Sequence, residues 1–225
     1  MLAKRNADFI LKQPDDSNGY RILRRAFLGS ALLAAAAAAL RGSPILRGVS
    51  AIAETSTTDV LRDTLNGLIA FLVPGPDAYS VAQGVSTAEQ GGLDAGITDI
   101  LVQSIDESAP YVPQFSAVVA SILNDLAQAV NPSANGNFVS PFARLAFAEK
   151  VQVFRMMDET ESLKPLAGVL PVFVGFLSYS EASVLDPATR ALSGQPVGWD
   201  ISHYDGVADG RDEFLGYFQN RRSAG

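Results

Sequence analysis

The chain has 225 residues, of which 48% are hydrophobic, so it is long and apolar enough to form a globular core. It contains no cysteine, which excludes disulfides, thiolate zinc sites, iron–sulfur clusters and haem attached through cysteine. The net charge is −7, and acidic proteins repel phosphate backbones and anionic lipid headgroups, so nucleic-acid and lipid-surface binding are disfavoured.

The N-terminal region carries the pattern of an export signal. Arg24 and Arg25 are followed by Phe27 and Leu28, and then by an alanine-rich apolar run that ends at Leu40. This run has the length of a signal-peptide core and is too short for a membrane-spanning helix of about 20 residues. The segment resembles a twin-arginine signal, which directs proteins that have already folded to the twin-arginine translocase.

A cleavage site follows the apolar run. Ala51 and Ala53 form an A-x-A motif, which predicts a signal peptide over residues 1–53 and a mature chain that begins at Glu54. Eight basic and three acidic side chains precede Glu54, so the remaining chain has a net charge of −12. We expect export to the periplasm, the cell envelope or the medium, with no stable membrane span after cleavage. The alternatives are an uncleaved leader that serves as an anchor, and an amphipathic N-terminal helix.

The mature part, residues 54–225, is predicted to be a single all-α domain. Leucines at helical spacing predict a helix over 58–73, which the turn at 74–77 ends. Residues 78–86 are predicted to be a loop. The sequence from Thr87 to Gln90 has the form of a capping box and predicts the start of a second helix, whose apolar stripe includes Leu93, Ile97, Leu101 and Ile105.

Three further segments complete the predicted bundle. A helix is predicted over 114–130, and a second over 140–159, with Ser140 as its N-cap and Pro141 at its first position. Residues 166–177 are apolar on every side and predict a buried central helix, kinked near Pro171. The expected fold is therefore a compact bundle of about five or six helices around a buried apolar helix.

The C-terminal region has a different composition. Residues 194–210 are rich in glycine, aspartate and aromatic side chains, and a short helix is predicted over 212–220. Trp199, His203 and Tyr204 lie in this Gly/Asp-rich loop region and are candidate partner contacts, because exposed aromatic side chains often dominate binding. Closure of the hydrophobic core is the alternative role for Trp199.

Residues that carry chemistry are few. His203 is the only histidine, and the acidic group at 205–213 does not have the spacing of an EF-hand calcium loop, so we predict no catalytic, cofactor-binding or metal-binding residue in this chain. A carboxylate pair at 158–161 is conceivable, but a solvated helix end is the simpler interpretation.

Several short segments together resemble the small subunit (subunit 3) of gluconate 2-dehydrogenase and its relatives. After the leader these are Val73-Pro74-Gly75-Pro76-Asp77, Gly92-Leu93-Asp94-Ala95-Gly96, Phe142 with Ala148-Glu149-Lys150, Phe154-Arg155-Met156-Met157, and Gly198-Trp199. The resemblance implies a non-catalytic accessory subunit of a FAD-dependent dehydrogenase of the glucose–methanol–choline type. In that family the small subunit binds the flavoprotein and supplies the export signal, and the FAD belongs to the partner.

Three other functions remain open from the sequence, one of which is that of a purely structural envelope protein. An exported helical binding protein for an apolar small molecule would need an enclosed pocket lined by residues such as Phe154, Phe173 and Phe176. A self-sufficient enzyme would need a polar cluster, most plausibly around His203, Tyr204 and Asp205.

Overall fold

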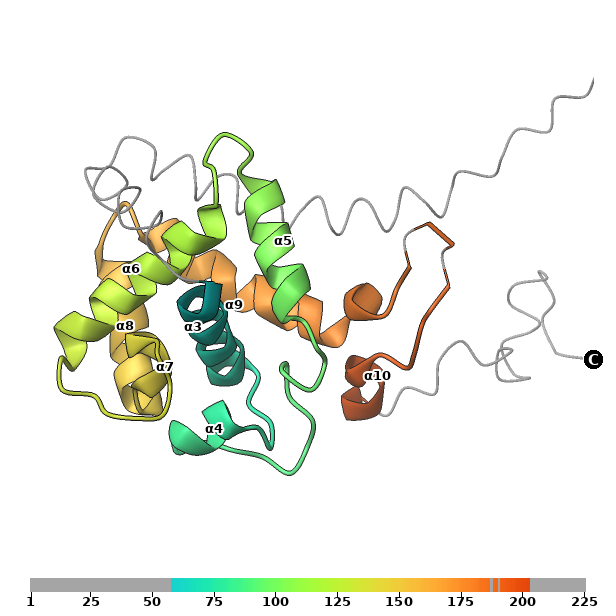
Figure 1. The fold of residues 1–225 in the computed structure, drawn as a ribbon, viewed down its shortest axis with the longest axis horizontal. Helices are drawn as coiled ribbons and strands as arrows, with labels where there is room; N and C mark the ends of the chain where they lie inside the picture. The colour runs from blue at the N-terminus through green and yellow to red at the C-terminus, as the bar shows by residue number, and fades with distance from the viewer. Residues whose placement is uncertain (1–57, 187, 190, 203–225) are drawn as a thin grey trace, which may run out of the picture.

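A computed structural model describes residues 58–186, 188–189 and 191–202, and this part of the chain is all-α, as predicted (Figure 1). Within these described residues, the only β-type pairing is an isolated antiparallel bridge between Leu185 and Leu192. The elements are α3 (Thr58–Leu72), α4 (Ala78–Ala82), α5 (Thr98–Ser108), α6 (Phe115–Val130), α7 (Pro141–Arg144), α8 (Phe147–Glu159), α9 (Lys164–Tyr179), a 3-10 turn η1 (Glu181–Ser183) and α10 (Val197–Ser202). The predicted signal peptide and the predicted helix over 212–220 lie outside the described residues.

Helix α3 occupies the centre of the described bundle. It contacts α4, α5, α6, α7 and α9, and Figure 1 shows it enclosed by α4 to α8 in front of α9. Its leucine stripe explains this position, because Leu65, Leu68 and Ile69 are all fully buried. The predicted helix over 58–73 is therefore confirmed, and α3 is the buried apolar helix around which the others pack.

Helix α9 contains the apolar segment 166–177 and continues through Pro171 without ending. The prediction that this segment is the buried central helix is wrong, because α3 occupies the centre and one side of α9 is exposed. Leu170, Val174 and Leu177 are at most 3% exposed, whereas Val172 is 62% exposed and Tyr179 is 50% exposed. The buried and the exposed side chains lie on different sides of the helix. Helix α9 therefore has one apolar face in the core and a second apolar face on the surface.

The capping box predicted at Thr87 is also wrong. Residues 87–97 form turns, and α5 begins at Thr98. The Thr87 hydroxyl contacts the carbonyls of Pro74 (3.2 Å) and Glu89 (2.9 Å). A Cβ on Gly91 would lie 2.6 Å from the Gly75 nitrogen, so the two glycines allow the backbones to meet.

Two other boundaries differ from the prediction. Residues 78–82 form the short helix α4 instead of a loop, because the Asp77 carboxylate accepts hydrogen bonds from the amides of Tyr79 and Ser80, both 2.9 Å. The helix predicted over 140–159 divides into α7 and α8. Ser140 caps α7 as predicted, but the backbone of Leu145 is extended and separates the two helices.

Candidate functional site

Most of the residues predicted to act in export or binding lie outside the described part of the chain. These are the export-signal residues Arg24, Arg25, Phe27 and Leu28, the cleavage-site residues Ala51 and Ala53, and the candidate contacts His203 and Tyr204. Trp199 is described, and it lies in α10.

Trp199 is half-buried against the end of α9. Its indole N–H lies 3.3 Å from a carboxylate oxygen of Glu181. A Cβ on Gly198 would lie 2.5 Å from the Tyr179 Cα, so only glycine allows α10 to approach α9 this closely. Trp199 therefore helps to hold α10 in place, and its role as a partner contact stays a prediction.

A buried carboxylate joins three elements. Asp63 on α3 is 8% exposed, and its two oxygens accept hydrogen bonds from the Tyr79 hydroxyl and the Ser140 amide, each 2.7 Å long. Burial and the neighbouring carboxylates raise the pKa of Tyr79 to about 12, so its phenol stays protonated and continues to donate. These bonds tie α4 and the start of α7 to α3.

A second polar cluster lies beside it. The Ser140 hydroxyl donates to the Asn124 side-chain carbonyl (2.8 Å), and the Asn124 amide donates to the Thr64 hydroxyl (2.9 Å). The Phe142 amide donates to the same Asn124 carbonyl at 3.1 Å. Asn124 therefore connects α6 to both α3 and the first turn of α7.

Lys150 is a fully buried lysine on α8. Its ammonium donates to the Gln83 side-chain carbonyl (2.9 Å) and the Gly67 backbone carbonyl (3.2 Å), and it lies 5.4 Å from the centre of the Phe142 ring. Desolvation lowers the pKa of Lys150 to about 8, although the charges of Asp77 and Asp63 act in the opposite direction.

Sequence reasoning named Lys150 only as part of the family resemblance and assigned it no role. A signal was present, because Lys150 lies three residues from Phe147 and Val153 and seven from Met157, on the apolar stripe of its helix. The hydrogen-bonding capacity of these polar clusters is met within the fold, since no buried side-chain nitrogen or oxygen among the described residues lacks a hydrogen-bond partner. Their evident chemical role is to hold α3, α4, α6, α7 and α8 together.

The acidic group at the end of α8 is solvent-exposed. Asp158, Glu159 and Glu161 are all exposed, and the described residues contain no group of three or more His, Cys, Asp or Glu side chains that could hold a metal ion. The exposure of these three side chains agrees with the interpretation of the group as a solvated helix end.

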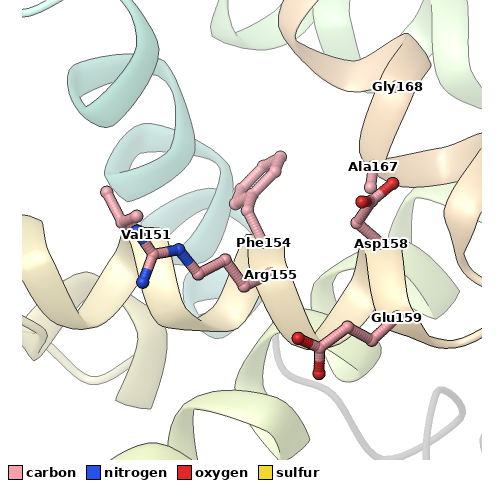
Figure 2. Close-up of a pocket in the computed structure, with 7 residues that line it drawn as sticks. All are labelled: Val151, Phe154, Arg155, Asp158, Glu159, Ala167 and Gly168. Carbon is pink, nitrogen blue, oxygen red and sulfur yellow. The ribbon is translucent and has the colours of Figure 1, made fainter.

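A shallow pocket of about 340 Å³ lies between α8 and α9 and opens widely to solvent (Figure 2). Figure 2 shows Asp158 pointing toward Ala167 on α9, and Glu159 pointing away from it. The lining residues are Val151, Phe154, Arg155, Asp158, Glu159, Ala167 and Gly168.

The pocket lies over an aromatic cluster. The ring of Phe71 lies 5.3 Å from that of Phe154 and 5.1 Å from that of Phe147. The pocket differs from the enclosed cavity that an apolar-ligand protein would need, because it is open and neither Phe173 nor Phe176 lines it.

The pocket adjoins what we name the outer face of α9, formed by Gly168, Val172, Gly175, Phe176 and Tyr179. These positions lie within about 100° of one another around a helix of 3.6 residues per turn. Phe176 is partly buried, and no residue of this face is charged. Within the described part of the chain, every helix is too short or too polar to cross a bilayer, α9 included.

Comparison of the chain with protein-family models, with curated proteins and with solved structures found no match.

Proposed function

We propose that this protein is a non-catalytic accessory subunit of an exported FAD-dependent dehydrogenase. In this proposal it binds the flavoprotein in the cytoplasm and supplies the twin-arginine signal with which the pair crosses the membrane folded. The FAD and the catalytic residues belong to the partner, which is of the glucose–methanol–choline oxidoreductase type.

The sequence supports the export part of the proposal. The motif formed by Arg24, Arg25, Phe27 and Leu28 precedes a short apolar core and the A-x-A motif at Ala51 and Ala53. Proteins that use this route are folded before export, and many contain cofactors or travel with a protein that does. A subunit with such a signal and no recognisable cofactor motif fits the second case.

The outer face of α9 supports the binding part, and it is the observation that carries the proposal. Val172 and Tyr179 are large apolar side chains that are at least half exposed on one face of a helix with no charged residue there. Exposed apolar side chains on an uncharged helix face of an acidic domain support a protein-binding role for this face. The polar clusters around α3 hold α3, α4, α6, α7 and α8 together, and α9 packs against α8, α3 and α5 of this frame.

Export of the partner tests the proposal. Replacing Arg24 and Arg25 together by Lys should leave both this chain and a flavoprotein dehydrogenase in the cytoplasm, because the partner depends on the signal of this subunit. Cell fractionation followed by flavin fluorescence and dehydrogenase assays of each fraction measures the outcome. Normal export of every flavoprotein dehydrogenase in the R24K/R25K strain would contradict the proposal.

A further inference from the structure

We infer that the outer face of α9 and the adjoining α8–α9 pocket form the docking site for the flavoprotein, and that the partner contributes an apolar segment flanked by basic side chains. This inference rests on the proposed function and assigns it a surface and a partner chemistry.

No packing contact within the described chain requires glycine at the two glycine positions of this face. A Cβ added to Gly168 or to Gly175 would have no neighbour within 4 Å, whereas one added to Gly67 or Gly198 would be within 3.0 Å of another helix. Glycine inside a helix costs about 1 kcal/mol relative to alanine. Glycines on a surface helix permit close approach of another backbone. In this inference, that backbone belongs to the partner.

The pocket offers an anchor point beside these glycines. Gly168 belongs both to the outer face of α9 and to the pocket, so the two are continuous. Val151, Phe154 and Ala167 form the apolar part of a lining that also includes the charged Arg155, Asp158 and Glu159. The pocket volume of about 340 Å³ can accept a large apolar side chain. Binding energy in interfaces is concentrated where such a side chain fills a pocket that excludes water.

The charges at both ends of α9 specify the partner. The N-terminal end carries the carboxylates of 158–161 with Arg155 and Lys164, and the C-terminal end carries Glu181, Asp186 and Asp200. Carboxylates therefore outnumber cations at both ends among the described residues. A partner segment with Arg or Lys at each end complements this surface, whereas a second copy of this chain would bring like charges together.

The size of the face indicates how it would be used. The outer face runs from Gly168 to Tyr179, which is about 18 Å of a helix about 10 Å wide, so its area is roughly 180 Å². Stable interfaces bury about 800 Å² on each partner, so this face is the apolar centre and the charged ends of α9 belong to the polar rim.

Photo-crosslinking of the full chain tests the inference directly. Benzoylphenylalanine placed at Val172 is expected to crosslink to the flavoprotein during expression in the native host. The same probe at Val81 is the matched control, because the two valines are almost equally exposed but lie on different helices. Val81 is 61% exposed on α4, and Val172 is 62% exposed on α9. A crosslink from Val172 to residues 203–225 of the same chain, or to a second copy, would overturn the inference.

Affinity purification of two variants separates the inference from the proposed function. Val172→Asp should lower the flavin that co-purifies by about tenfold or more, and Val81→Asp should leave it unchanged. If both variants retain the flavoprotein, the docking site is wrong and the accessory role stands. If the unmodified chain retains no flavoprotein, the proposed function fails, and the inference that rests on it fails too.

Discussion

Burial of Lys150 has a large electrostatic consequence. A fully buried ammonium is unfavourable unless hydrogen bonds compensate for its lost hydration, and here the carbonyls of Gln83 and Gly67 accept two. The protonated form is nevertheless less favourable in the folded chain than in water, since the pKa falls from 10.5 to about 8.

This shift makes stability depend on pH. Between about pH 8 and pH 10.5 the unfolded chain binds the Lys150 proton more tightly than the folded chain, so the free energy of unfolding should rise with pH by up to ~3 kcal/mol. Below pH 8 both states are protonated and this contribution is constant. Above pH 10 the raised pKa of Tyr79 acts in the opposite direction, because the folded chain retains a proton that the unfolded chain loses.

Urea unfolding at pH 7, 8, 9 and 10 measures the effect. Lys150→Met should flatten the rise above pH 8, and Lys164→Met, at an exposed position at the start of α9, should preserve it. An unchanged slope in Lys150→Met would show that another group causes the pH dependence.

Two glycine substitutions are expected to have opposite effects. A Cβ on Gly67 would lie 2.9 Å from the Ala143 Cα, so Gly67→Ala should force α3 and α7 apart and destabilise the fold by roughly 1–3 kcal/mol. Gly168→Ala meets no atom within 4 Å and should stabilise the isolated chain by up to ~1 kcal/mol. Chemical denaturation of both variants checks the prediction, and a shift of the same sign in both would contradict it.

At the scale of elements, Gln83 completes the end of α3. The Ala70 carbonyl would receive its helical hydrogen bond from residue 74, but Pro74 has no N–H. The Gln83 side-chain amide replaces that donor at 2.8 Å, and the Gln83 backbone carbonyl accepts from the Phe147 amide at 2.9 Å. Gln83 thus connects the ends of α3 and α4 with the start of α8.

Removing this side chain should destabilise the bundle. Gln83→Ala leaves the Ala70 carbonyl without its replacement donor and Lys150 without one acceptor, so a loss of about 2–3 kcal/mol in the free energy of unfolding is expected. Gln103→Ala, at an exposed position on α5, is the control and should change it by less than about 0.5 kcal/mol. Equal effects in the two variants would exclude the connecting role of Gln83.

Sequence periodicity predicted the long helices α3 and α6 because each has a sustained apolar stripe, and the continuous apolar run over 166–177 predicted α9. Periodicity did not predict α4, because five residues are too short to show a helical period. The capping box predicted at Thr87 does not form, because the Thr87 hydroxyl hydrogen-bonds the Pro74 carbonyl instead. The exposed side of α9 was also missed. An apolar residue such as Val172 carries no local signal that distinguishes core from interface, and only the packing of neighbouring helices decides it.

The whole molecule combines a predicted export signal, a strongly acidic chain after residue 53 and an exposed apolar helix face. A net charge of −12 after residue 53 favours encounter with a positively charged partner surface, and such attraction is weakened by salt. The association rate with the flavoprotein should therefore fall as ionic strength rises. Stopped-flow mixing at increasing NaCl concentration measures it, and a rate independent of salt would contradict a basic docking surface on the partner.

Co-purification tests the central claim most directly. The tagged full-length chain is purified from its own host, and the eluate is analysed by size-exclusion chromatography with a simultaneous absorbance spectrum. The account predicts that the chain elutes in a complex larger than a monomer and with the absorbance of a flavin. A colourless chain that elutes alone at the size of a monomer would contradict the accessory-subunit function.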